Sequence, residues 1–143
     1  MKKIIRITIG AIVILGVILV IGLNINNSER KPLKNLDANE VVSIEAAALP
    51  PNEIKYINQS EDIIKIIDKL KKVVVSERVK QNEYAGQVIM YTLIMKGGSK
   101  REVMISNPIV RIDGVFYKVK YDSTDDLANL YNKLRYKSIK KNN

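Results

Sequence analysis

The first pattern along the chain is a long apolar run. No charged residue lies between Ile7 and Ser28, and the segment 4–23 is apolar apart from Arg6, Thr8 and three glycines. About 20 residues at 1.5 Å each reach roughly 30 Å, the thickness of a bilayer's hydrocarbon core. We therefore predict an N-terminal transmembrane helix. Its anchoring side chains include Ile4, Ile7, Ile12, Ile14, Leu19 and Leu23.

Two other interpretations of this run stay open, a cleaved signal peptide and a buried helix of a soluble domain. A signal peptide has an apolar region of about 7–15 residues and ends in small residues at its cleavage site. This run is longer and ends in VIGLNINNSER, which favours an uncleaved anchor. Lys2, Lys3 and Arg6 lie close to its start, so we expect a cytoplasmic N-terminus and an extracellular C-terminal domain in the cell membrane.

The pattern divides the chain into four parts. Residues 1–23 form the basic end and the anchor, 24–39 a polar tether, 40–136 a small domain and 137–143 a basic tail. The domain begins with a predicted strand over 41–47, which Pro50 and Pro51 end because proline cannot continue a strand ladder.

A helical pattern follows in SEDIIKIIDKLKKVV, residues 60–74. Apolar residues recur at the spacing of one helix face, and Ser60 is expected to cap the helix start. The expected buried stripe consists of Ile63, Ile66, Ile67, Leu70 and Val74. We expect this stripe to pack on the domain's own sheet rather than on a partner.

Beyond residue 86 the apolar residues alternate with period 2, which is typical of strands. Four strands are predicted, over 87–96, 100–106, 109–112 and 115–121. The run 88–95 is apolar on both faces, which predicts a central strand.

The dipeptide Asp-Gly at 113–114 predicts a type I′ hairpin between the last two of these strands. This turn would pair Ile112 with Val115 and Val110 with Tyr117 across the two strands. These four side chains are expected to share a buried face.

The last pattern is a second helix in STDDLANLYNKLRY. Ser123 and Asp126 have the spacing of a capping box, and Leu127, Leu130, Tyr131 and Leu134 form the expected buried stripe. The predicted fold class is therefore α+β. One N-terminal transmembrane helix precedes a small antiparallel sheet with two helices packed on one face, in the order β-α-β-β-β-β-α.

The charge distribution argues against nucleic acid as a partner. The formal net charge is +9, but residues 32–132 carry 14 basic and 14 acidic residues, so the excess lies in the two end segments. No basic face is therefore expected on the body of the domain. The anchor would contact membrane lipid, and the basic tail could meet lipid headgroups or a wall polyanion outside the cell.

The sequence offers little catalytic chemistry. With no histidine and no cysteine, thiolate nucleophiles, lipid attachment through cysteine, Cys/His zinc sites and histidine bases are excluded. Asp122, Asp125 and Asp126 gather at a predicted helix start, where the helix dipole explains them without a metal. We predict no enzyme activity, no cofactor and no metal.

The layout of one span, a small domain and a closing helix, with IDGVFYKVKY near the end, resembles uncharacterised membrane-anchored or lipoprotein-like exported domains of Gram-positive bacteria. The resemblance covers about residues 40–136 and implies no activity. The lysine-, isoleucine- and asparagine-rich composition also fits such a source.

We therefore expect a single-pass extracytoplasmic binding or interaction module at the cell envelope. The candidate interaction surface includes Phe116 and Lys118, which point away from the buried face of the hairpin. A cytoplasm-facing, membrane-tethered regulatory domain is the alternative. A hydrolase built on carboxylates alone is a third possibility. It would need Glu77, Glu83 or Glu102 to meet Asp113 or Asp122.

Overall fold

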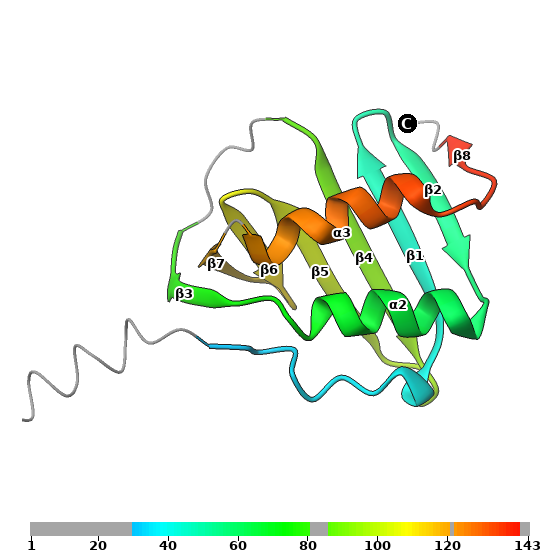
Figure 1. The fold of residues 1–143 in the computed structure, drawn as a ribbon, viewed down its shortest axis with the longest axis horizontal. Helices are drawn as coiled ribbons and strands as arrows, with labels where there is room; N and C mark the ends of the chain where they lie inside the picture. The colour runs from blue at the N-terminus through cyan, green and yellow to red at the C-terminus, as the bar shows by residue number, and fades with distance from the viewer. Residues whose placement is uncertain (1–29, 81–85, 121, 141–143) are drawn as a thin grey trace, which may run out of the picture.

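The computed structural model describes residues 30–80, 86–120 and 122–140. Eight strands form one antiparallel sheet in the order β3-β7-β6-β5-β4-β1-β2-β8 (Figure 1). In chain order the elements are the 3-10 helix η1 (Ala38–Glu40), β1 (Val41–Leu49), β2 (Glu53–Ile57), α2 (Ser60–Leu70), β3 (Val75–Arg78), β4 (Val88–Met95), β5 (Lys100–Ser106), β6 (Ile109–Ile112), β7 (Val115–Val119), α3 (Asp122–Lys133) and β8 (Ile139–Lys140).

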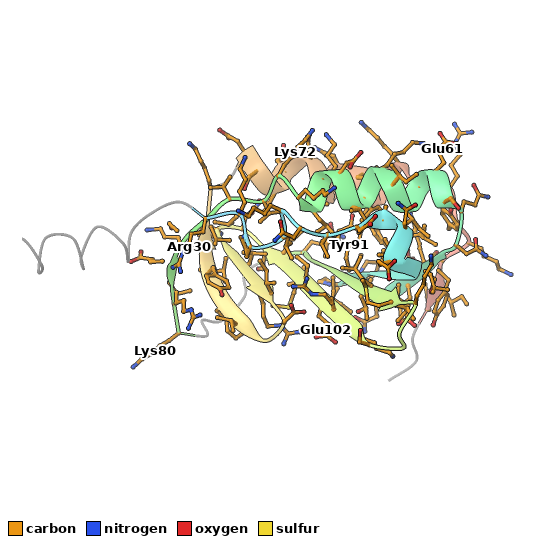
Figure 2. The ribbon with its side chains drawn as sticks, turned by 90° about the horizontal axis from the view of Figure 1, so that it is seen from below. Arg30, Glu61, Lys72, Lys80, Tyr91 and Glu102 are labelled. Carbon is orange, nitrogen blue, oxygen red and sulfur yellow. The ribbon has the colours of Figure 1, made fainter. Side chains whose placement is uncertain are left out.

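Both helices cover the same face of the sheet, as predicted (Figures 1 and 2). In α2 the buried side chains are Ile63, Ile66, Ile67 and Leu70, which confirms the predicted stripe except at its end. The helix stops at Leu70, so Val74 lies beyond it and is only partly buried. Ser60 does not cap α2. Gln59 takes the cap position without a side-chain hydrogen bond.

The Asp-Gly hairpin between β6 and β7 is confirmed. Ile112 pairs with Val115 and Val110 with Tyr117, in the predicted register. Asp113 and Gly114 have φ values of 48° and 85°, the left-handed conformation that a type I′ turn requires at both central positions. Val115, at the turn, is more exposed than predicted.

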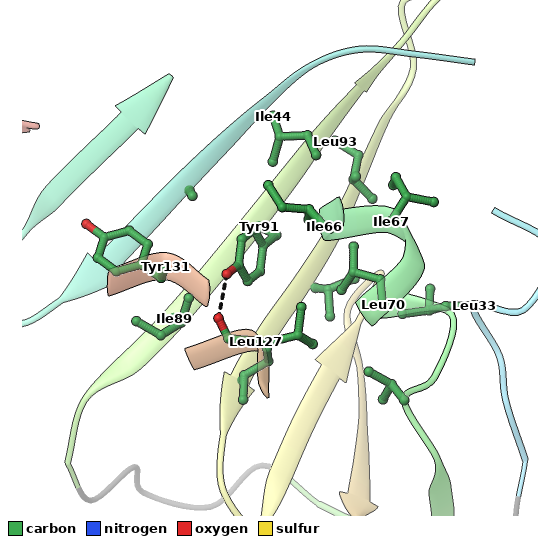
Figure 3. Close-up of a cluster of buried hydrophobic side chains, with 14 of the residues drawn as sticks. Leu33, Ile44, Ile66, Ile67, Leu70, Ile89, Tyr91, Leu93, Leu127 and Tyr131 are labelled. Atoms are coloured by element: carbon green, nitrogen blue, oxygen red, sulfur yellow. Dashed lines mark hydrogen bonds between the residues drawn. The ribbon is translucent and has the colours of Figure 1, made fainter. Parts of the chain in front are cut away.

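The core lies between the helices and the middle of the sheet (Figure 3). The predicted central strand β4 does lie inside the sheet, between β1 and β5. Its Tyr91 is completely buried, and the hydroxyl donates a hydrogen bond of 2.7 Å to the carbonyl of Leu127 in α3. This bond satisfies the one polar group of the ring and ties the helix layer to the sheet.

The second predicted helix is confirmed as α3, but the predicted capping box does not form. Ser123 is the second residue of the helix rather than its cap, and its hydroxyl accepts a hydrogen bond of 3.2 Å from the backbone N–H of Val74. Asp126 is paired instead with Lys69 of α2, so it links the two helices. Leu127, Tyr131 and Leu134 are buried as expected, whereas Leu130 is partly exposed.

The predicted order β-α-β-β-β-β-α is wrong because three strands were missed. β2 is short and follows Pro50-Pro51, β3 lies in a segment that is mostly polar, and β8 has only two residues. All three lie at or next to an edge of the sheet. Edge strands bury few side chains, so they leave little alternation in the sequence.

The predicted membrane-spanning helix falls in a part of the chain that the structure does not describe. Its residues, including Ile4, Ile7, Ile12, Ile14, Leu19 and Leu23, lie outside the described residues. Among the residues that the structure describes, no helix is long and apolar enough to cross a membrane, and α2 and α3 have 11 and 12 residues. The α+β character is confirmed, but the fold class as predicted is wrong.

Part of the predicted tether belongs to the folded domain. Leu33 and Leu36 are 1% and 5% exposed and join the main core. Arg30 forms a bridge with Val75 of β3. At the other end, Ile139 and Lys140 of the predicted tail region pair with β2. The described domain therefore extends beyond the predicted limits of 40–136 on both sides.

Candidate ligand-binding site

A hollow of about 600 Å³ lies where the N-terminal segment meets the β3–β7 edge of the sheet. We call it the basic hollow. It is lined by Arg30, Lys31, Pro32, Lys34, Val74, Val75 and Tyr117. Arg30 lies at the end of the sheet where β3 and β7 are found (Figure 2).

Two contacts hold the N-terminal wall of the hollow. The backbone N–H of Arg30 donates to the carbonyl of Val75, and the N–H of Val75 donates to the carbonyl of Arg30, both at 2.8 Å. Three residues further on, Leu33 is buried in the core. Because Leu33 is inserted, the flanking residues Lys31 and Lys34 stay exposed and line the hollow.

The wall of the hollow is strongly cationic. Arg30, Lys31 and Lys34 are all exposed, and within the described part of the chain none of them forms an ion pair. None of the seven described lining residues is acidic. The guanidinium of Arg78 lies over the ring of Tyr117, 5.9 Å from its centre, and adds a fourth positive charge nearby. Such a concentration of one sign attracts anions.

The other half of the lining is apolar or aromatic. Val75 is buried, and Val74 and Tyr117 are partly buried. The pairing of β3 with β7 places Val75 opposite Val119 and Arg78 opposite Tyr117. The hollow thus combines exposed positive charges with an apolar floor.

A second, smaller hollow of about 260 Å³ shares Val74 and Val75 with the first. It is lined further by Ser76, Lys118, Val119 and Lys120. Lys118, a residue of the predicted interaction surface, therefore lies beside the candidate site, where it pairs with Glu77 at 3.7 Å. Phe116, the other predicted residue, is partly buried on β7 and lines neither hollow.

The carboxylates do not converge on this site. Asp113 accepts hydrogen bonds from Arg101 at 2.6 Å and from the backbone N–H of Glu102 at 3.0 Å. The Glu102 carboxylate in turn pairs with Arg111 at 3.3 Å. Neither lines the hollow: Glu102 lies on β5, and Asp113 lies in the turn between β6 and β7. Each negative charge is therefore matched by an arginine.

The acidic cluster at the start of α3 gives no metal centre in the structure. The ammonium group of Lys69 holds the pKa of Asp126 below its usual value, through a hydrogen bond and its charge. Among the described residues no group of three or more potential ligands could hold a metal ion. Asp122 is exposed at the helix start, and Glu83 lies outside the described residues.

The sequence pattern did not reveal the basic hollow. Arg30, Lys31 and Lys34 stand in the predicted tether, a polar segment with no strand or helix pattern. The one available signal is Leu33, an apolar residue within RKPLK. A buried leucine between lysines fixes that segment on the domain and presents the lysines outward.

No protein-family model matches the chain, and neither curated proteins nor solved structures give a match to it. The resemblance to exported domains of Gram-positive bacteria therefore stays a prediction.

Proposed function

We propose that the chain is a binding module of the cell envelope and that the basic hollow is its binding site for an anionic ligand. The observation that carries this proposal is the set of three exposed cations, Arg30, Lys31 and Lys34, around one hollow whose described lining residues include no acidic side chain. The bridge from Arg30 to Val75 and the burial of Leu33 fix the backbone that carries these three side chains.

The charge pattern of the domain supports this choice of site. Several cations elsewhere on the domain are matched by carboxylates: Lys65 with Glu61, Lys69 with Asp126, Arg101 with Asp113, and Lys118 with Glu77. A paired cation has less attraction left for a ligand, because its partner's charge opposes that of the incoming anion. Among the residues that the structure describes, no carboxylate forms an ion pair with Arg30, Lys31 or Lys34.

The location at the envelope is supported by the apolar segment 4–23 of the sequence and by the basic residues before it. We propose that this segment attaches the chain to the cell membrane with the domain outside. Protease treatment of intact cells that express the chain with a C-terminal tag tests the location. Loss of the tag is expected, and a tag that survives until the cells are lysed supports the cytoplasm-facing alternative instead.

A titration of the full chain tests the binding function. The chain is held in neutral detergent and titrated with poly(glycerol phosphate), with uncharged dextran as the reference. We expect saturable binding of the anionic polymer and none of dextran. The hollow variant, R30Q with K31Q and K34Q, should bind roughly tenfold to a hundredfold more weakly, because the three lost charge contacts together remove up to about 3 kcal/mol.

The basic C-terminal segment provides a matched control. The tail variant, K133Q with R135Q and K137Q, loses the same charge from three residues that are also exposed. We expect it to bind the polymer almost as well as the unmodified chain. If the two variants weaken binding equally, or the tail variant weakens it more, the basic hollow is not the site and the proposal is wrong.

A carboxylate-only hydrolase has less support. Of the acidic residues considered for it, Glu102 and Asp113 are brought close by the hairpin, but both are paired with arginines at the surface. The absence of enzyme activity stays a prediction.

A further inference from the structure

We infer that the ligand of the basic hollow is the phosphate headgroup of anionic phospholipid in the membrane to which the chain is attached. This inference rests on the proposed function and names its ligand. The hollow would then dock the domain on the membrane surface, rather than capture a polymer from the wall.

Only a short length of chain separates the apolar segment from the hollow. The apolar segment ends at Leu23, and Arg30 is seven residues further on. At 3.3–3.6 Å per residue, seven residues reach at most about 25 Å. Arg30 is itself a wall of the hollow. If segment 4–23 enters the membrane, the hollow cannot move far from the headgroup layer.

This short connection raises the effective concentration of lipid at the site. A site that is tethered beside its ligand binds it as an intramolecular event, with effective concentrations in the millimolar range for short linkers. A wall polymer has no such advantage. A modest affinity for one headgroup is therefore enough to keep the domain docked.

The chemistry of the lining fits a lipid phosphate. The guanidinium of Arg30 can donate two parallel hydrogen bonds to phosphate oxygens, and Lys31 and Lys34 add positive charge beside it. Each lysine or arginine close to an anionic membrane strengthens binding about fivefold. The contribution falls off over roughly 8–10 Å at moderate salt, so it acts when the hollow lies against the headgroups, which a connection of at most about 25 Å allows.

The apolar residues of the lining can contact the glycerol backbone of the lipid, next to its headgroup. Pro32, Val74 and Tyr117 offer apolar surface beside the cations. Tyrosine is enriched at membrane interfaces, because its ring is apolar and its hydroxyl is polar. A headgroup phosphate held by Arg30 would place the glycerol backbone of the lipid against these side chains.

The test uses the full chain in lipid nanodiscs and measures how close each residue comes to the headgroups. One set of discs contains phosphatidylcholine alone, and the other also contains phosphatidylglycerol. Both contain a trace of lipid with a gadolinium chelate on its headgroup, which broadens the amide NMR signals of nearby residues. The readout compares Tyr117, in the hollow, with Asn129, an exposed residue of α3.

We expect the amide signal of Tyr117 to be broadened more than that of Asn129. This difference in broadening should grow several-fold when phosphatidylglycerol is present. The hollow variant should return the anionic discs to the values of the neutral discs. The tail variant should not. Equal broadening of Tyr117 in both kinds of disc, or an unchanged pattern in the hollow variant, would overturn the lipid inference.

The two failures can be told apart. If the nanodisc test fails but poly(glycerol phosphate) still binds and the hollow variant still weakens it, the hollow binds a polymer and only the lipid inference is wrong. If neither ligand responds to the hollow variant, the proposed function is wrong as well.

Discussion

Arg30 and Val75 exchange two backbone hydrogen bonds of 2.8 Å, which join the N-terminal segment to the edge strand β3. Lys31, the next residue, donates no backbone hydrogen bond within the described part of the chain. We therefore expect the amide of Arg30 to exchange with solvent much more slowly than that of Lys31. Hydrogen exchange followed by NMR measures both. Equal rates would mean that this wall of the basic hollow is not fixed.

The second contact that positions this wall is the burial of Leu33. Because Leu33 is 1% exposed in the core, L33A should lower the free energy of unfolding by about 2–5 kcal/mol. The exposed Val42, at 54%, gives the control, and V42A should change stability by no more than about 0.5 kcal/mol. Denaturant unfolding measures both. A tether that does not pack on the domain would make the two variants alike.

The buried hydroxyl of Tyr91 gives a third prediction. Y91F removes the hydrogen bond to the Leu127 carbonyl and should cost about 0.5–1.5 kcal/mol of unfolding free energy. Tyr56 is half exposed and makes no hydrogen bond through its hydroxyl among the described residues. Y56F should therefore be nearly neutral.

Tyr91 also makes the free energy of unfolding depend on pH. Burial, and to a smaller extent the charge of Tyr131, raise the pKa of Tyr91 above its ordinary value of 10.0. The stabilising effect of keeping this group neutral is complete below pH 10 and is lost as the pH rises through the folded-state pKa. Stability should fall by up to about 1.4 kcal/mol per pH unit above pH 10 from this one proton. The slope should be smaller in Y91F, and an unchanged slope would contradict the assignment.

Some of this structure was accessible from the sequence because it depends on local patterns. The stripe of α2 and the Asp-Gly turn each specify their geometry within a few residues, and both predictions are confirmed, apart from Val74 at the end of the stripe. β3 and β8 were not, because each exists as a strand only through its partner, β7 or β2. Their own residues are largely exposed and show no alternation.

The candidate site was missed for a related reason. Arg30, Lys31 and Lys34 become a cluster only when Leu33 enters the core and Val75 comes alongside. The contact between Arg30 and Val75 joins residues that lie more than forty positions apart in the sequence. The predicted surface residue Lys118 lies beside the site because the smaller hollow that it lines shares Val74 and Val75 with the basic hollow.

Gly114, in the turn of the β6–β7 hairpin, tests whether a left-handed backbone conformation requires glycine at this position. Gly114 has a φ of 85°, and a Cβ placed there would meet no atom within 4 Å. G114A should therefore cost about 1–2 kcal/mol from backbone conformation alone. At Gly97 the added Cβ also meets nothing, but the backbone is not left-handed. G97A should be neutral or slightly stabilising, so a similar loss in both variants would refute the explanation.

The position of the ligand on the surface is the most direct test of the central claim. The isotope-labelled full chain, in neutral detergent, is titrated with poly(glycerol phosphate) while its amide shifts are recorded. The account predicts that the largest changes fall on residues 30–34, Val74, Val75 and Tyr117 and disappear when salt is raised. Changes centred instead on residues 133–140, or the absence of any saturable change, would contradict it.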